Sequence, residues 1–400
     1  MENNNVLVCP RNKIIQDITS DRYKFYNSMY GQSPVWSDEL NAWMVFDFKM
    51  IKEFLNDKRL YANRKGDFIK KLGLSEENET FLSTFYSRWL MYMDNPNHSE
   101  LRKKIQLPLN KLNKSIFPAV KDFAAEIIQN LGTSRTIDIA EEIAEPFVTK
   151  VMSDLLGINE AEYTLLLKEA NSAIDFLWKP QPTEQETLET IHSIQKTHDI
   201  ISNIILEERH KKDRLIHLMV ENTKLDEESM DLIINIAIDG HEPLVSSVKT
   251  YILVYLEDIL DRELNLEDIS LKNLIEKSLR LEAPFPYCAR NASEEIQIGN
   301  EVIGKGQRII FFISAGNRDH KEFSGHQLKE NPAKNLTFGV GSHYCLGAII
   351  TRRSIEELAL ALEEKMKYVK DVEILNLKWT DTFGFRTLTE FNVLFKDAEL

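Results

Sequence analysis

The 400-residue chain has 49 basic and 63 acidic side chains, a formal net charge of −14, and 43% hydrophobic residues. This acidic balance argues against binding nucleic acid through a general basic field, and the apolar fraction is ordinary for a globular core. Cys9, Cys288 and Cys345 are too few for a disulfide framework, which indicates a reducing compartment. The N-terminus has no apolar signal-peptide core, and no segment reaches roughly 18 uninterrupted apolar residues. We therefore expect a soluble, cytoplasmic protein that does not enter a membrane.

Apolar residues recur with helical period along most of the chain. The segments with this pattern are 48–56, 101–112, 119–131, 139–157, 160–176, 184–211, 229–260 and 348–365. Strand-like stretches are short and lie near the ends of the chain, at 42–47, 295–298, 308–313 and 392–395. Because glycine and proline are scarce and no linker or repeat divides the chain, the sequence predicts a single domain over residues 1–400. The expected fold is mostly α with small peripheral β-sheets.

The predicted helix 229–260 is unusually long, about 48 Å at 1.5 Å per residue. Its middle is apolar nearly all round, which is typical of a helix buried in the core. The polar sequence Asp239-Gly240-His241-Glu242-Pro243 interrupts this apolar surface. Buried polar groups cost a few kcal/mol unless they are paired, and a proline inside a helix costs about 3 kcal/mol. The segment is either a polar kink between two shorter helices or a kink that faces a cofactor or substrate.

A glycine-rich segment, FGVGSHYCLG at 338–347, precedes the last predicted helix. Its glycine spacing does not fit a dinucleotide or phosphate loop, and His343 and Cys345 have no second cysteine pair to complete a zinc site. The remaining interpretation is one thiolate at a helix N-terminus, in a loop whose glycines let the backbone approach something flat. An axial thiolate ligand of haem requires this arrangement.

The same segment meets every fixed position of the pattern F-G-x-G-x-H-x-C-x-G, and the chain therefore resembles the cytochrome P-450 family. Four further family motifs follow the expected order: Trp89 to Arg102, the sequence VMSDLLG at 151–157, Arg290-Asn291-Ala292, and Ala315-Gly316-Asn317-Arg318-Asp319. The resemblance covers nearly the whole chain. It implies the cytochrome P-450 fold, with haem between the long central helix and the cysteine loop.

The resemblance also implies a cofactor and the residues that hold it. The cofactor is heme b (iron protoporphyrin IX), with Cys345 as the iron ligand in a loop that includes Phe338, Gly339 and Gly347. Four residues stand at the family positions that meet the haem propionates: His98, Arg102, Arg290 and His343. His98 and Arg102 are spaced i, i+4 and share one helix face, and two buried carboxylates need such charge-assisted partners.

The central helix departs from the family pattern A-G-x-E/D-T. Asp239 replaces the alanine and Pro243 replaces the threonine, so the usual hydroxyl is missing. By resemblance, Asp239, Gly240, Glu242 and Pro243 are the candidate catalytic residues. Proline has no N–H to donate to the carbonyl of Asp239, so we expect the helix to open or bend here. Asp239 or Glu242 would then relay protons in place of the hydroxyl.

A second departure concerns the family sequence E-x-x-R, which here reads Lys277-Ser-Leu-Arg280. Counting back from the cysteine loop, Glu330 takes the position usually held by an arginine. We therefore expect a sign-reversed core pair between Lys277 and Glu330, near Arg280. The alternative is that Lys277 points to solvent and Glu276 turns inward.

The resemblance implies a monooxygenase that oxidises a small hydrophobic or biosynthetic substrate with O2. Electrons would come from a separate ferredoxin or flavodoxin and its reductase, docking on a basic patch of Lys103, Lys104, Arg352 and Arg353 unless these only form a solvated face. Five aromatic residues suggest an apolar pocket or ordinary core packing: Phe68, Phe81, Phe85, Phe176 and Trp178. One alternative is atypical haem-thiolate chemistry, namely peroxide-driven oxidation, cyclisation, coupling or rearrangement. The other is a haem or ligand-binding protein without turnover.

Overall fold

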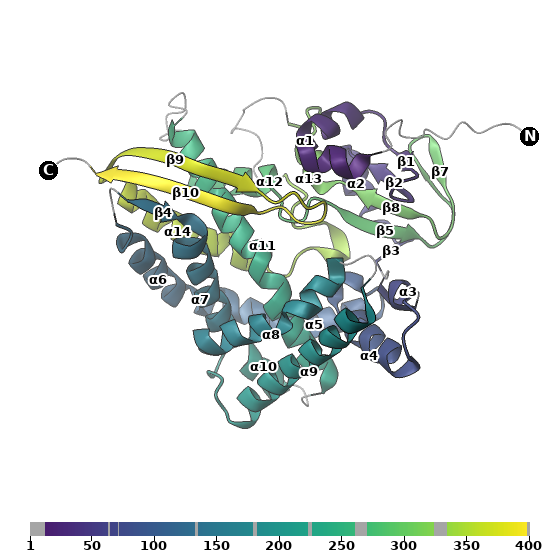
Figure 1. Ribbon diagram of the computed structural model, residues 1–400, viewed down its shortest axis with the longest axis horizontal. Helices are drawn as coiled ribbons and strands as arrows, with labels where there is room; N and C mark the ends of the chain where they lie inside the picture. Colours follow the sequence, from purple (N-terminus) through teal and green to yellow (C-terminus); the bar gives the residue numbers. More distant parts are fainter. Residues whose placement is uncertain are drawn as a thin grey trace, which may run out of the picture. The chain divides into compact units, whose positions relative to one another are not determined.

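Helices dominate the computed structural model, which describes residues 13–62, 65–70, 72–132, 135–178, 182–222, 226–260, 270–323 and 334–397 (Figure 1). The α-helices of these ranges are α1 Ile14–Met29, α2 Phe48–Phe54, α3 Lys65–Lys70, α4 Glu76–Ser87, α5 Asn97–Ser115, α6 Phe117–Gln129, α7 Glu145–Leu156, α8 Glu160–Trp178, α9 Glu184–Leu206, α10 Leu215–Asn222, α11 Glu227–Leu260, α12 Leu271–Leu281, α13 Ile313–Gly316 and α14 Ala348–Met366. Three short turns accompany them: η1 Leu90–Tyr92, the π-helical η2 Ala140–Ala144, and η4 Gly341–His343.

The strands are short and form three small sheets. Their bounds are β1 Val35–Ser37, β2 Ala42–Val45, β3 Leu60–Tyr61, β4 Thr136–Asp138, β5 Cys288–Ala292, β6 Ile296–Ile298, β7 Glu301–Ile303, β8 Arg308–Phe311, β9 Val369–Trp379 and β10 Leu388–Asp397. The sheets have the orders β1-β2-β8-β5-β3, β4-β10-β9 and β6-β7. The prediction of a mostly helical fold with small sheets is confirmed. None of the described helices is long and apolar enough to cross a membrane.

The described residues fall into two compact units. The first unit consists of the described parts of Met1–Ala62, Ser246–Cys345 and Ile374–Asn392. The second unit consists of the described parts of Asn63–Val245, Leu346–Glu373 and Val393–Leu400. Helix α11 contributes its first part to the second unit and its last part to the first. The single domain over residues 1–400 stays a prediction.

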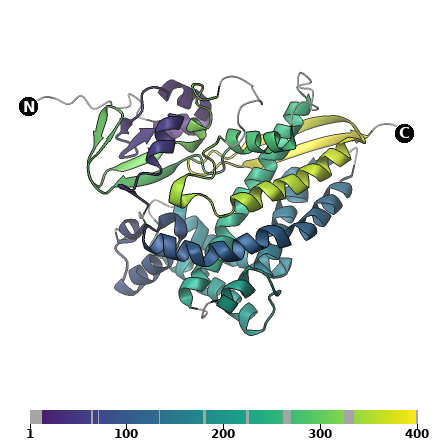
Figure 2. The same cartoon turned by 180° about the vertical axis from the view of Figure 1, so that it is seen from behind.

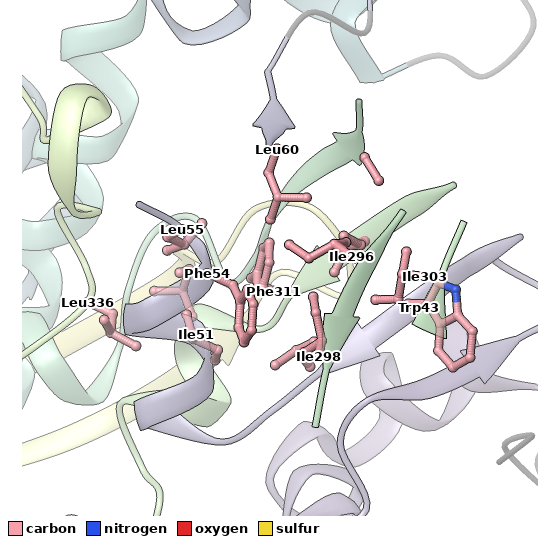
Figure 3. Close-up of a cluster of buried hydrophobic side chains, with 14 of the residues drawn as sticks. Trp43, Ile51, Phe54, Leu55, Leu60, Ile296, Ile298, Ile303, Phe311 and Leu336 are labelled. Atoms are coloured by element: carbon pink, nitrogen blue, oxygen red, sulfur yellow. The ribbon is translucent and has the colours of Figure 1, made fainter. Parts of the chain in front are cut away.

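The first unit is built on the five-stranded sheet. Strands β2 and β8 pair in parallel, with Val45 opposite Phe311, and β5 runs antiparallel to β8. Figure 3 shows Phe311 facing Ile51 and Phe54 of α2, in a cluster of buried apolar side chains that also includes Leu336. Because Leu336 begins the segment leading into the cysteine loop, burial of this side chain anchors the loop to the hydrophobic core.

The second unit is a helical assembly. Helices α6 and α14 lie side by side, as Figures 1 and 2 show, and α8 packs along α9. Each presents an apolar face to its neighbour, which is the main source of stability for helices of this length. Helix α9 begins with a capping box in which Thr183 and Glu186 each accept the other's backbone N–H. Each predicted helical segment in this unit contains a helix, but the segment 139–157 is divided into η2 and α7, and the segment predicted at 184–211 ends at Leu206.

Some elements carry little signal in the sequence. Helix α1 has non-helical torsion angles at Asp21, so its apolar residues do not keep one helical register. Strand β9 has only Val372 buried, so it lacks the alternation that marks a half-buried strand. The predicted opening of the central helix at Pro243 is wrong, because α11 is helical from Glu227 to Leu260, and a bend at this point stays a prediction. Packing around the helix outweighs the hydrogen bond that the proline removes.

Candidate active site

The cysteine loop of the first unit is closed by its own backbone. The Cys345 amide donates to the Phe338 carbonyl at 2.8 Å, and the Gly339 amide donates to the Leu336 carbonyl at 2.8 Å. The Cys345 side chain is exposed, whereas Phe338 is buried. The loop therefore holds Cys345 in a fixed backbone frame and leaves the residue exposed.

Two glycines of this loop adopt the left-handed conformation, Gly339 with φ +70° and Gly341 with φ +68°. A side chain at either position would be strained, because a Cβ crowds the following carbonyl when φ is positive. At Gly341 a Cβ would also collide with the Asn56 side-chain oxygen. The glycines in the sequence pattern thus have a backbone reason that is independent of any ligand.

A network of side-chain hydrogen bonds holds the segment before the loop. Asn317 accepts from the Leu336 amide at 2.7 Å and donates to the Thr337 hydroxyl at 2.9 Å. The Thr337 hydroxyl donates to the Leu279 carbonyl at 2.7 Å, and Arg280 donates to the Asn317 carbonyl at 2.8 Å. The network links α12, the end of α13 and residues 335–337, so two sequence motifs jointly position the entry to the cysteine loop.

The predicted pair of Lys277 and Glu330 is not observed, since Glu330 lies outside the described residues. Lys277 instead places its ammonium 2.6 and 2.8 Å from the two carboxylate oxygens of Asp258 on α11. Glu276 is buried and accepts from the Asn335 amide at 2.8 Å. The alternative in which Glu276 turns inward is therefore found, although Lys277 pairs with a carboxylate rather than pointing freely to solvent.

The four residues expected at the haem propionates lie in both units. His98 is buried and Arg102 half-buried on α5 of the second unit, and they share one helix face. In the first unit, Arg290 is buried on β5 and donates to the Ala289 carbonyl at 2.9 Å, and His343 is half-buried in η4. Their joint role stays a prediction.

The polar segment of α11 contains a carboxyl group with an unusual pKa. Burial raises the pKa of Asp239 to about 7, although the Asn235 amide, which donates to its carboxylate at 2.8 Å, acts in the opposite direction. Gly240 lies against α7, where a Cβ would come within 2.7 Å of the Met152 methyl group. Asp239 can therefore exchange a proton near neutral pH, and Gly240 permits a close approach of two helices.

His241, to which the sequence motifs assign no role, contacts side chains of two other helices. Its Nε2 lies 3.0 Å from a carboxylate oxygen of Glu145 on α7, and its Nδ1 lies 3.1 Å from the Tyr163 hydroxyl on α8. That hydroxyl also lies 3.0 Å from the Ala237 carbonyl. Burial raises the pKa of Tyr163 well above its usual value, and the charges of Glu242 and Glu145 raise it further.

A cavity of about 340 Å³ opens beside this segment. Its lining residues come from α8 and α11, namely Thr164, Leu167, Lys168, Asn171, Ile174, Ile238, His241 and Glu242. Glu242 is exposed, and Pro243 is half-buried inside the helix. Of the four candidate catalytic residues, Glu242 thus lines a cavity that solvent can enter, whereas Asp239 is held by its own helix.

Comparisons with known proteins identify the family. A family model described as Cytochrome P450 matches residues 269–362. The biotin biosynthesis cytochrome P450 of Bacillus subtilis (strain 168) is 24% identical over 392 residues, covering 94% of this chain and 96% of the relative. This chain belongs to the cytochrome P450 family. The 6-deoxyerythronolide B hydroxylase of Saccharopolyspora erythraea is 27% identical over 368 residues, covering 86% of this chain and 88% of the relative.

Solved structures give the same fold. The crystal structure of P450BioI in complex with a hexadec-9Z-enoic acid ligated acyl carrier protein has a TM-score of 0.82 at 22% identity, covering 96% of this chain and 100% of that chain. The chain is thus an enzyme of the cytochrome P450 class, and the predicted cytochrome P450 fold is confirmed. The alternative of a haem protein without turnover is not supported.

Heme b is the cofactor of this cytochrome P450, as in its family. The described residues fit the group. The Cys345 thiol is exposed in a loop fixed by its own amide, and thiolate is an established axial ligand of haem iron. At Gly339 the positive φ of +70° favours glycine, so this position of the loop carries no side chain. Gly347 is the N-cap residue of α14, two residues after the thiol.

The predicted docking patch of this cytochrome P450 is largely engaged in internal contacts of the second unit. The Lys104 ammonium pairs with the Glu228 carboxylate. The Arg353 guanidinium lies 3.8 Å from the centre of the Phe117 ring and also donates to a backbone carbonyl of α5. Arg352 donates to the Ala348 carbonyl at 3.3 Å, and Lys103 is exposed. Redox docking on this patch stays a prediction.

Three of the aromatic residues singled out in the sequence of this cytochrome P450 lie against other aromatic rings. The Phe68 and Phe176 rings are 6.0 Å apart, and Phe176 stacks on Tyr86 at 5.5 Å. Phe85 is buried 5.8 Å from Trp89. Core packing therefore accounts for these three phenylalanines, while the side chain of Trp178 lies outside the described residues.

Sequence reasoning missed two clusters in this cytochrome P450. One is His241 with Glu145 and Tyr163, for which the only signal was a histidine within an apolar helix. The other surrounds Glu282, whose carboxylate accepts from Arg318 at 2.8 Å and from Arg386 at 3.1 Å, and contacts the Tyr23 hydroxyl. The Arg318 guanidinium also lies 3.9 Å from the centre of the Tyr23 ring. Partners up to 259 positions apart leave no pattern in a single sequence.

Proposed function

We propose that this cytochrome P450 oxidises a small, hydrophobic substrate of a biosynthetic pathway, using O2 and electrons from a separate ferredoxin or flavodoxin and its reductase. The names of its relatives support this proposal, because they include a biotin biosynthesis cytochrome P450 and a 6-deoxyerythronolide B hydroxylase. The observation that carries the proposal is the cysteine loop, closed between Cys345 and Phe338 with the thiol exposed.

The proposed haem site is centred on the cysteine loop. Cys345 supplies the thiolate, and Phe338, Gly339 and Gly347 shape the loop around it. The propionates would be held by His98, Arg102, Arg290 and His343, because buried carboxylates need charge-assisted hydrogen bonds. When bound, thiolate-ligated haem supplies the redox chemistry that activates dioxygen.

The protein's own contribution to the reaction is proton delivery. Asp239, with a pKa of about 7, can hold a proton and release it near neutral pH. Glu242 lines the cavity, so its carboxylate can take protons from solvent. General acid–base assistance of this kind contributes roughly 10²- to 10⁴-fold in rate. Gly240 keeps α7 close to this segment, and Pro243 leaves the segment without the hydroxyl that the family normally uses.

The test is reconstituted turnover under ¹⁸O2 with a screened substrate, a ferredoxin and its reductase. We expect one labelled oxygen atom in the product and tight coupling of electrons to product. Asp239→Asn and Glu242→Gln should each lower product formed per electron and raise peroxide release, while Pro243→Thr should be tolerated. Glu257→Gln, at an exposed carboxylate about 22 Å further along the same helix, is the matched control and should leave coupling unchanged.

If both carboxylate variants keep wild-type rate and coupling, protons come from substrate or water alone. If no substrate yields labelled product, the monooxygenase proposal fails.

A second candidate function keeps the haem thiolate but changes the reaction. Pro243 at the position of the family threonine favours peroxide-driven oxidation, cyclisation, coupling or rearrangement, since these need less control of proton delivery to dioxygen. Product formed with hydrogen peroxide and no reductase, or product without labelled oxygen, would support this candidate over the first.

A further inference from the structure

The cluster around His241 differs from an ordinary buried histidine because two carboxylates approach the same imidazole. One ring nitrogen or carboxylate oxygen from each of Glu145, His241 and Glu242 can be chosen so that all three lie within 4.8 Å of one another. His241 is buried, whereas the Glu145 side chain is 43% exposed and Glu242 is exposed. Two like charges at this separation repel each other, and a bound cation would relieve that repulsion.

The second ring nitrogen of His241 is held from outside the cluster. Nδ1 lies 3.1 Å from the Tyr163 hydroxyl, and that hydroxyl lies 3.0 Å from the Ala237 carbonyl. When the hydroxyl proton is directed at the carbonyl, Nδ1 must donate to the hydroxyl oxygen, and the lone pair of Nε2 then faces Glu145. Metal-binding histidines typically donate their other N–H to an oxygen in this way, which fixes the ring and its tautomer.

We propose that Glu145, His241 and Glu242 bind a divalent transition-metal cation of the Zn²⁺ type. One imidazole and two carboxylates are a donor set that Zn²⁺ accepts, and a nitrogen ligand disfavours Mg²⁺ and Ca²⁺. The site lies wholly within the second unit and involves no residue of the cysteine loop.

The cavity beside the cluster provides what such a site needs besides its ligands. His241 and Glu242 line this space of about 340 Å³, so a cation has a path from solvent, and a water molecule can take the fourth position. Lys168 lines the same cavity, and its charge offsets one of the two carboxylates. The remaining negative charge still favours binding of a cation. The same two carboxylates also raise the pKa of Tyr163.

The experiment is equilibrium dialysis of the haem-loaded protein against Zn²⁺ at pH 7.5, with Mg²⁺ in excess. We expect one Zn²⁺ per haem and a higher unfolding temperature with Zn²⁺, because a cation that binds only the folded state stabilises it. His241→Gln should abolish the binding. Glu242→Gln, at an exposed position where folding is not at risk, should weaken it at least tenfold. Tyr163→Phe, which removes only the outer contact, should weaken it about 10- to 100-fold.

His217→Gln is the matched control, since the half-buried His217 also pairs with a carboxylate, that of Glu221 at 3.1 Å, in the same unit, and this variant should bind Zn²⁺ as the parent does. Absence of saturable Zn²⁺ binding would overturn the proposal, as would equal affinity in the parent, His241→Gln and Glu242→Gln proteins. The contact between His241 and Glu145 would then be an ordinary hydrogen bond with the proton on Nε2.

Discussion

The cysteine loop and the polar segment of α11 are built in opposite ways. In the loop, the backbone determines the structure, through two left-handed glycines and through backbone hydrogen bonds such as that between Cys345 and Phe338. In the segment 239–243, the backbone is plain α-helix, and side-chain contacts, some of them with other helices, distinguish its residues. His241, for example, is placed by Glu145 and Tyr163, which lie 96 and 78 positions away.

The comparison teaches why one region resembles its family and the other does not. A loop that needs positive φ at fixed positions tolerates few residues, so its sequence pattern stays recognisable. A helix tolerates many side chains at one position provided that its neighbours satisfy them, so its chemistry can change while its shape stays the same. Four variants test this contrast, ordered here from the largest expected effect to the smallest.

The largest effect is expected from Cys345→Ser. Loss of the thiolate should remove the strongly red-shifted Soret band that reduced thiolate haem shows with carbon monoxide, and with it all turnover. Difference spectroscopy of the reduced protein measures this directly. Cys288→Ser and Cys9→Ser are the controls and should keep the band. An imidazole-type spectrum in the intact protein would contradict the assignment of Cys345.

Gly341→Ala should destabilise the loop through its backbone. A left-handed alanine costs about 1–2 kcal/mol, and the collision with Asn56 adds about 1–3 kcal/mol. The free energy of unfolding from urea titration is the measurement. Gly306→Ala is the control, because Gly306 also has positive φ, at +82°, but no atom lies within 4 Å of the position that an alanine methyl group would take there.

Combining Gly341→Ala with Asn56→Ala should recover only the steric part of the loss. If Gly306→Ala and Gly341→Ala lower the free energy of unfolding by the same amount, crowding by Asn56 does not contribute to the loss at Gly341.

Lys277→Glu should cost about 2 kcal/mol, because it places a second carboxylate against the nearly buried Asp258. Adding Asp258→Lys should restore much of the stability, since the pair is re-formed with exchanged signs. Urea unfolding of both single variants and the double variant gives the coupling free energy. If Glu330→Arg rescues Lys277→Glu and Asp258→Lys does not, the pair predicted from the sequence is the real one.

Asp239→Asn should have the smallest effect, and one that depends on pH. The folded protein raises the pKa of Asp239 to about 7, so the carboxyl's contribution to stability is full below its unfolded pKa near 4 and is lost as the pH rises through 7. The stability of the variant relative to that of the parent should therefore increase from pH 5 to pH 8. A fully enclosed carboxyl with this pKa shift would lower the stability of the parent by ~4 kcal/mol at pH 8. Because Asp239 keeps some solvent exposure, we expect the variant to be more stable than the parent by only about 1–2 kcal/mol at that pH.

Thermal unfolding at the two pH values measures this difference. Asp199→Asn, at an exposed site on α9, is the control and should change the unfolding temperature by the same amount at both pH values. If the Asp239→Asn protein differs from the parent by the same unfolding temperature at every pH, burial does not raise the pKa of this carboxyl.

The sequence determined the features that depend on neighbours along the chain. Helical period predicted α5 to α9, α11 and α14, and the glycine and cysteine spacing predicted the loop at 338–347, because backbone torsion and amphipathicity are local properties. Only the tertiary structure decided which charges meet. Glu276 rather than Lys277 is the inward group of α12, Lys277 pairs with Asp258, and His241 joins Glu145 and Tyr163. These contacts depend on how helices rotate and pack against one another, and burial makes each of them worth more than the local preference that the sequence shows.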